Sequence, residues 1–307
     1  MHVAKNSKFS KSIVWAALFL SGTGTAVAAN YDGVVIIGDS LSDGGYYSAI
    51  GGQRFTTNPG QTAAEYVAEG LGFTTTPSNQ EGNNYAQGGA RINSDSASTP
   101  PMYAQRPVST QVTEFLTKNS GQNRANTVIL IQGGANDVFQ NFGDYANGTI
   151  SQAQLNGLTQ QSGIDLVTQI AKVASTGSRY IIVQNMPNLG VTPYMNSLGA
   201  AASAGASQLA QGFNTVVDKG LTQAGVNVVL LDNYRLISEV VANPTAYGFS
   251  NATGVACSVS SSLFCSSQTL VSPDAASTYV FADGVHPTTA AQKLSAQYAL
   301  SVFNAPK

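Results

Sequence analysis

Short apolar runs rich in β-branched residues recur along this chain, and a helical pattern follows each of them. The runs occupy residues 34–37, 128–131, 180–183 and 226–231, and residues 73–76 are a further candidate strand. Runs of this length are too short for buried helices, so they are better explained as buried strands. Their alternation with helices is the signature of βα units and a mostly parallel sheet.

Helical spacing of apolar residues fills the stretches between these runs. The predicted helices cover residues 62–71, 108–117, 151–175, 200–223 and 288–303. Together with the strands they predict an α/β fold: a flavodoxin-like three-layer α/β/α sandwich with a mostly parallel sheet of about five strands. In such sheets, functional groups gather beyond the carboxyl ends of the strands.

The N-terminus has the features of a signal peptide. Three lysines lie within the first eleven residues, an apolar run covers residues 13–20, and Ala-Val-Ala at 26–28 fits the cleavage pattern. The apolar run is too short to cross ~30 Å of hydrocarbon. We therefore expect cleavage after Ala28 or Ala29, with residues 1–28 as signal peptide and 29–307 as one domain without a stable membrane span.

Removal of this segment changes both the charge and the supply of imidazole. It leaves 11 of the 14 basic groups against 16 acidic ones, a net charge of −5. This charge argues against nucleic acid and anionic membrane surfaces as partners. Of the two histidines, His2 is lost, so chemistry that needs imidazole must use His286.

The two cysteines, Cys257 and Cys265, lie in a Gly/Ser-rich stretch at 254–268. In an exported protein we expect a disulfide that closes a short loop and contributes on the order of 2–3 kcal/mol. Two thiols with one distant imidazole do not form a usual zinc ligand set. We therefore expect neither a metal nor another cofactor.

Two segments directly after predicted strands carry candidate chemistry. Ser40, in the segment 38–43, can present its hydroxyl at the rim of the sheet, although a strand-to-helix turn with Ser or Asp as cap would look the same. Asn136, in the segment 132–137, can donate its amide to a developing oxyanion. Capping of the next helix by Asn136 or Asp137 is the alternative.

Two further segments supply a backbone donor and a base. Gly88 and Gly89 permit close approach of a backbone N–H, but paired glycines also mark ordinary turns. Asp283 and His286 are three residues apart on one short loop before the last predicted helix. A carboxylate so placed can hold the imidazole in the tautomer that accepts a proton.

Four segments resemble, in order, the four sequence blocks of the GDSL lipase/esterase family, the SGNH hydrolases. They are GDSLSD at 38–43, the Gly-Gly block, GGAND at 133–137 and DGVHP at 283–287. The resemblance covers essentially the whole chain after the leader and is strongest to bacterial secreted and outer-membrane esterases. Residues 54–58, Arg-Phe-Thr-Thr-Asn, also resemble a segment of the larger members.

This resemblance implies a role for each matching residue. Ser40 would be the nucleophile, His286 the general base and then acid, and Asp283 its partner. The oxyanion hole would comprise the Ser40 N–H, the Asn136 side chain and the N–H of Gly89, assigned by its spacing from Asn84, with Gly88 as the alternative.

The expected reaction is hydrolysis of a carboxylic ester of a small molecule or lipid, with a lipid or short- to medium-chain acyl ester favoured over a sugar acetate or choline ester. We expect loops 80–101 and 243–272 to line the pocket.

We further expect a monomer that is secreted or periplasmic, or associated with the outer membrane of a Gram-negative cell, and a free enzyme instead of a truncated autotransporter. A non-catalytic adhesin or carbohydrate-binding module is the competing class, and the intact Ser40, Asn136, Asp283 and His286 argue against it.

Overall fold

The main sheet consists of four parallel strands in the order β1-β2-β3-β4. The structure is a computed structural model that describes residues 31–94 and 105–305, so the expected signal peptide lies outside the described residues. The strands are β1 (Gly33–Ile37), β2 (Thr127–Ile131), β3 (Tyr180–Gln184) and β4 (Val229–Leu231). All four apolar runs form these strands, although β4 is shorter than the run at 226–231.

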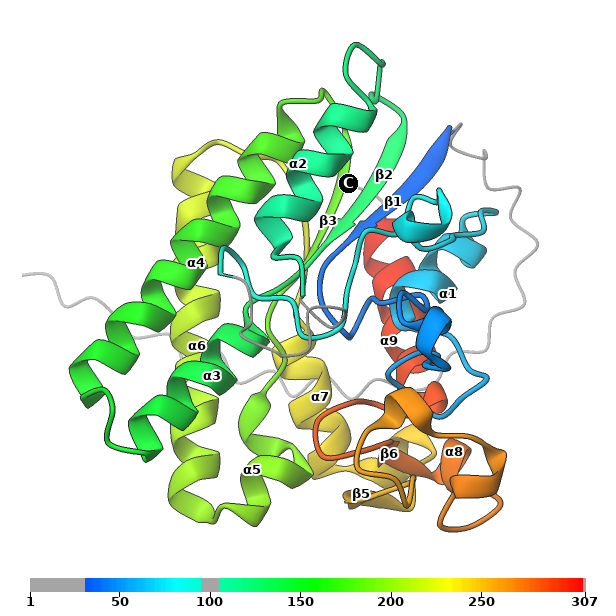
Figure 1. Ribbon diagram of the computed structural model, residues 1–307, viewed down its shortest axis with the longest axis vertical. Helices are drawn as coiled ribbons and strands as arrows, with labels where there is room; N and C mark the ends of the chain where they lie inside the picture. Colours follow the sequence, from blue (N-terminus) through cyan, green and yellow to red (C-terminus); the bar gives the residue numbers. More distant parts are fainter. Residues whose placement is uncertain (1–30, 95–104, 306–307) are drawn as a thin grey trace, which may run out of the picture. The chain divides into compact units, whose positions relative to one another are not determined.

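Helices cover both faces of this sheet, because alternate residues of each strand point to opposite sides (Figure 1). One face packs against α2 (Val108–Lys118), α4 (Gln152–Ala174) and α6 (Ala200–Gln223), and the other against α1 (Ala63–Gly70) and α9 (Thr289–Phe303). In β1, for example, Val35 and Ile37 join the first core while Val34 and Ile36 join the second. The three-layer α/β/α architecture is thereby confirmed.

Side-chain caps set where several of these helices begin. Thr62 and Ser151 form capping boxes with Glu65 and Gln154 at the starts of α1 and α4. Each box satisfies N–H groups that a helix start would otherwise leave without partners. The further helices are α3 (Ala135–Ala146), α5 (Pro193–Ser197), α7 (Asn233–Ala242) and α8 (Ala275–Thr278).

The prediction of a strand at 73–76 is wrong, and the expected fifth strand is reduced to a single bridge beside β1. Asn84 forms isolated parallel bridges with Ile36 and Pro77. Between Pro77 and Asn84 the chain reverses through a 3₁₀ turn (Ser78–Gln80). The turn is tight, since a Cβ at Gly82 would lie 1.9 Å from the Thr76 carbonyl oxygen. This tight turn leaves too little extended chain for a full ladder.

A second, two-stranded parallel sheet lies outside the main one and was not foreseen. It pairs β5 (Asn251–Val255) with β6 (Tyr279–Phe281), and α8 precedes β6 (Figure 1). Cys257 and Cys265 form a disulfide just after β5, with their Cα atoms 5.8 Å apart. The loop that carries Asp283 and His286 follows β6, so this unit positions part of the candidate site.

Candidate active site

Ser40 lies in the turn that follows β1, at the carboxyl end of the sheet. The exit of the strand is held by Gln111 of α2, whose side-chain amide accepts from Gly38 N and donates to Gly38 O, both at 2.9 Å. A Cβ at Gly38 would come within 2.6 Å of the Gln132 amide. The glycine and the two amides therefore fix the path of the chain into Ser40.

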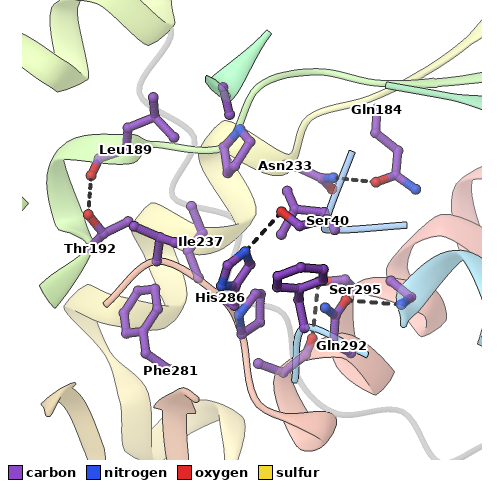
Figure 2. A pocket seen from close by; sticks show the side chains of 18 of the residues that line it. Ser40, Gln184, Leu189, Thr192, Asn233, Ile237, Phe281, His286, Gln292 and Ser295 are labelled. Carbon is purple, nitrogen blue, oxygen red and sulfur yellow. Dashed lines mark hydrogen bonds between the residues drawn. The ribbon is translucent and has the colours of Figure 1, made fainter. Parts of the chain in front are cut away.

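Ser40 and His286, 246 residues apart in sequence, meet at hydrogen-bond distance. His286 Nε2 lies 2.9 Å from Ser40 Oγ, and His286 Nδ1 lies 2.9 and 2.8 Å from the two carboxylate oxygens of Asp283 (Figure 2). With Nδ1–H donating to the carboxylate, Nε2 is the acceptor for the serine hydroxyl. The three side chains thus form a continuous chain from hydroxyl to imidazole to carboxylate.

Asp283 is nearly buried and accepts three backbone hydrogen bonds. The donors are Ser262 N at 2.7 Å, His286 N at 2.9 Å and Val285 N at 3.0 Å. Burial by itself would raise the pKa of Asp283, but the facing imidazole and these hydrogen bonds hold that pKa well below the ordinary range. The carboxylate is therefore ionised at neutral and mildly acidic pH.

Residues 54–58 hold the histidine loop from the other side. The Phe55 ring contacts the His286 imidazole, with centroids 4.9 Å apart and planes tilted by 40°. Thr56 Oγ1 donates to the Pro287 carbonyl at 2.9 Å, and Asn58 Nδ2 donates to the Ser262 carbonyl at 3.0 Å. The segment therefore fixes both His286 and the donor to Asp283.

The paired glycines are distinguished by their partners. Gly88 N donates to the buried carboxyl of Asp43 at 2.8 Å, whereas Gly89, with φ +81°, lines the cavity at Ser40. Burial raises the pKa of Asp43 to about 6, even though the N–H groups of Tyr46, Gly88 and Gly45 act in the opposite direction. Since Gly88 N–H is already engaged, Gly89 is the better candidate for a donor to the site.

Asn136 lies in the first turn of α3 and lines the same cavity. The N-cap of α3 is Gly134, and no side chain makes a capping hydrogen bond there, so Asn136 and Asp137 do not cap the helix. Asn136 Nδ2 instead donates to the Ala90 carbonyl at 2.9 Å. This bond uses one amide hydrogen, and the other can serve a ligand.

A family model described as GDSL-like lipase/acylhydrolase matches residues 34–299. The chain belongs to this family. It is similar to Esterase EstA of Pseudomonas aeruginosa (30% identity over 344 residues, 96% of this chain and 51% of the relative) and to Lipase 1 of Photorhabdus luminescens (26% over 352 residues, 94% and 53%). The chain thus spans about half the length of these two relatives. GDSL esterase/lipase APG of Arabidopsis thaliana is 27% identical over 270 residues, covering 77% of this chain and 76% of the relative.

Among solved structures, the chain is similar to phospholipase A1 from Streptomyces albidoflavus NA297, at 16% identity and a TM-score of 0.44. The match covers 88% of this chain and 98% of that chain. The resemblance carried by the four sequence blocks is confirmed by the family match. The four blocks come together in this structure: one residue from each lines the same cavity. These residues are Ser40, Gly89, Asn136 and His286.

This cavity has a volume of about 260 Å³, and most of the residues that line it are apolar. The expectation that loops 80–101 and 243–272 line it is wrong for the described residues, of which only Gly89 contributes. Phe249 packs in a core cluster instead, and α3, α7, α9 and the segment after β3 form the walls. Leu189, Leu236, Ile237, Val240 and Phe281 are among its apolar residues.

Two positioning residues of this GDSL protein escaped the sequence argument. Gln111 is fully buried at a core-facing position between Val108 and Val112, and a polar residue on an apolar helix face is the signal that points to it. Ser262 acts through its backbone N–H, for which the sequence offers no signal.

Within residues 31–94 and 105–305, no cluster of three or more His, Cys, Asp or Glu residues could hold a metal ion. The same part of the chain contains no helix long and apolar enough to cross a membrane.

Proposed function

We propose that this chain hydrolyses carboxylic esters through an acyl-enzyme on Ser40. The observation that carries the proposal is the hydrogen-bonded series from Ser40 Oγ through His286 to Asp283, at 2.9 and 2.8–2.9 Å. Serine hydroxyls react as nucleophiles when an adjacent base removes their proton and a third group orients that base. The names of the relatives, esterase and lipase, agree with this reaction class.

In the first half of the reaction, Ser40 Oγ attacks the ester carbonyl carbon while its proton passes to His286 Nε2. The tetrahedral intermediate collapses when His286 gives this proton to the departing alcohol oxygen, which leaves the acyl group on Ser40. Water then attacks the acyl carbon, loses a proton to His286, and the acid leaves as that proton returns to Ser40 Oγ. The ionised Asp283 stabilises the imidazolium formed in each half.

The oxyanion of both tetrahedral intermediates would be stabilised by the N–H groups of Ser40 and Gly89 and by the Asn136 amide. Ser40, Gly89 and Asn136 line the cavity at the nucleophile, and the engaged N–H of Gly88 favours Gly89 over its neighbour. Fixed donors of this kind stabilise the transition state more than the substrate, because the negative charge develops only there.

The acyl group would occupy the apolar part of the cavity. A cavity of ~150 Å³ accommodates benzene, and on that scale the space of 260 Å³ holds about ten carbon atoms. A lipid or short- to medium-chain acyl ester therefore fits better than a bulky long chain held entirely inside.

We further propose that residues 1–28 are a cleaved signal peptide, that 29–307 form one domain, and that the enzyme acts as a monomer outside the cytoplasm. The Cys257–Cys265 disulfide supports this location, since disulfides persist in oxidising compartments.

Chromogenic esters from acetyl to palmitoyl test the reaction, with Ser40→Ala as the decisive variant. We expect turnover by the wild type and a loss of about 10⁶-fold in kcat for Ser40→Ala at an unchanged melting temperature. Ser42→Ala is the matched control, because Ser42 is a buried serine of the same turn whose hydroxyl accepts from Gln132 Nε2 at 3.4 Å, whereas the Ser40 hydroxyl meets His286. Retention of activity by Ser40→Ala excludes Ser40 as nucleophile, and no turnover on any ester favours a binding module.

A further inference from the structure

Three neighbouring backbone N–H groups in the glycine block differ in their partners. Gly88 N donates to Asp43 Oδ2 at 2.8 Å, and Ala90 N donates to the Gln87 carbonyl at 3.1 Å. The N–H of Gly89, between them, has no acceptor among the described residues, although Gly89 lines the cavity at the nucleophile. Most backbone N–H groups in folded proteins are paired, so an unpaired one at a cavity is available to a ligand.

The direction of the Gly89 N–H is tied to the carbonyl of the same peptide group. The Gly88–Gly89 peptide is trans, since Asn58–Pro59 is the only cis peptide among the described residues. In a planar trans peptide the C=O and the N–H point in opposite directions. A group that holds the Gly88 carbonyl on one side therefore fixes the Gly89 N–H on the other.

Tyr47 holds this carbonyl. Its hydroxyl lies 2.8 Å from Gly88 O and must be the donor, because a carbonyl oxygen only accepts. Gln87 Nε2 donates to the same hydroxyl at 3.2 Å, which leaves the hydroxyl hydrogen for Gly88 O. Tyr47 is buried, and burial raises the pKa of its hydroxyl to about 12. The hydroxyl therefore keeps its proton, and its role as donor, at neutral pH.

The Phe55 ring packs against the same arrangement. A Cβ at Gly88 would lie 2.2 Å from this ring, so only a glycine fits there. The centroid of the Phe55 ring is 6.1 Å from that of Tyr47 and 4.9 Å from that of His286. One aromatic side chain thus contacts the glycine block, the tyrosine that holds it and the proposed base.

We propose that Tyr47 is a positioning residue of the oxyanion hole: its hydroxyl fixes the Gly88–Gly89 peptide so that the Gly89 N–H faces the oxyanion, while Asp43 holds the N–H before it. This inference rests on the proposed ester hydrolysis at Ser40. Tyr47 does not line the cavity and acts only through the peptide. The hydrogen bond that it donates also polarises the peptide group, which makes the opposite N–H a stronger donor.

Tyr47→Phe removes the hydroxyl and keeps the ring. Loss of one oxyanion donor costs about 10²–10³ in kcat, and here the donor is displaced instead of removed. We therefore expect kcat to fall by about 10- to 100-fold with KM little changed. Tyr298→Phe is the matched control, because the Tyr298 hydroxyl accepts from a backbone N–H, that of Asp232 at 3.2 Å, and does not line the cavity. Both variants can melt earlier, but only Tyr47→Phe should lose kcat per folded molecule.

A trifluoromethyl ketone provides a readout that a merely structural role would not change. Ser40 Oγ adds to the carbonyl carbon of octyl trifluoromethyl ketone, its proton passes to His286, and the carbonyl oxygen becomes an oxyanion. The inhibition constant of this ketone should rise in Tyr47→Phe by about the factor by which kcat/KM falls, because the adduct and the transition state share the oxyanion. Octyl methyl ketone, which forms no stable adduct, should inhibit both enzymes equally.

Should Tyr47→Phe fail to fold, Asp43→Asn loosens the same peptide from the other end. One Asp43 oxygen accepts from Gly88 N, and the other accepts from Gly45 N and Tyr46 N at 2.9 and 2.7 Å. An amide has only one acceptor oxygen and cannot serve both sides. We expect the same pattern: a lower kcat, a similar KM and weaker inhibition by the trifluoromethyl ketone.

A folded Tyr47→Phe enzyme with the wild-type kcat and inhibition constant overturns the proposal, and means that the hydroxyl only stabilises the fold. Equal losses of kcat in Tyr47→Phe and Tyr298→Phe overturn it as well, as does a wild-type kcat in Asp43→Asn if that variant has to replace Tyr47→Phe. If the wild type neither hydrolyses any chromogenic ester nor binds the trifluoromethyl ketone, the ester hydrolysis on which the inference rests is contradicted instead.

Discussion

Replacement of Asn136 by alanine separates a catalytic amide from a structural one. Its Nδ2 atom donates to the carbonyl of Ala90, a residue with no exposed surface, at 2.9 Å. If the remaining amide hydrogen binds the oxyanion, its contact is made mainly in the transition state. Asn136→Ala should then lower kcat by about 10²–10³, or ~2.7–4 kcal/mol of transition-state stabilisation, with KM little changed.

The same substitution should also cost stability, and this cost can be separated from the catalytic effect. Loss of the donor leaves the buried Ala90 carbonyl without this hydrogen bond, which costs about 1–3 kcal/mol of folding free energy. For a domain of this size each kcal/mol lowers the melting temperature by about 2–4 °C. Asn119→Ala is the control, because Asn119 Nδ2 makes the same kind of bond to the Phe115 carbonyl, at 2.7 Å, away from Ser40.

The assay measures kcat, KM and melting temperature on one preparation of each variant. Both variants should melt earlier, but only Asn136→Ala should lose kcat. If Asn136→Ala loses stability as Asn119→Ala does and keeps the wild-type kcat per folded molecule, Asn136 does not belong to the oxyanion hole. Stabilisation would then come from the backbone N–H groups of Ser40 and Gly89.

Further predictions concern the base, its carboxylate partner, its aromatic support and the disulfide. Activity should fall in acid and rise with pH, because His286 accepts the serine proton only when its imidazole is neutral. The pKa of Asp283 lies below the ordinary ~3.9 of an unfolded chain. Its ionised carboxylate therefore stabilises the fold fully above about pH 3.9, and this stabilisation is lost in stronger acid, where the carboxylate takes up a proton. Phe55→Leu should lower kcat by about 10- to 100-fold with little change in KM, because the ring contacts His286 and occupies the space where a Cβ at Gly88 would lie. Mass spectrometry before and after reduction and alkylation should find Cys257 and Cys265 joined in the exported protein.

Each of these has a result that would contradict it. A rate that does not vary between mildly acidic and mildly alkaline buffers, with the protein folded, excludes an imidazole base. A Phe55→Leu enzyme with wild-type kcat at every pH means that the ring only fills space. Two free thiols in protein recovered from the culture medium exclude the disulfide in solution.

The sequence by itself determined the elements of the fold and the order of its functional segments. Strand runs and helix faces are local properties, since burial of a face requires apolar residues at a period of 2 or 3.6. The run at 128–131 became part of β2, and α6 has the predicted bounds Ala200–Gln223. His286 could be singled out because the expected loss of His2 leaves no other imidazole.

Only the tertiary structure decided which groups meet. The Ser262 N–H on Asp283 and the Gln111 amide on Gly38 join segments 21 and 73 residues apart, and no local pattern encodes such distances. The same holds for the engagement of Gly88 by Asp43, which distinguishes it from Gly89. Nor could the pocket walls be predicted, because hydrophobic periodicity shows only that a helix face is buried and not which segment covers it. In the folded chain, residues of α7 and α9 line the cavity at Ser40.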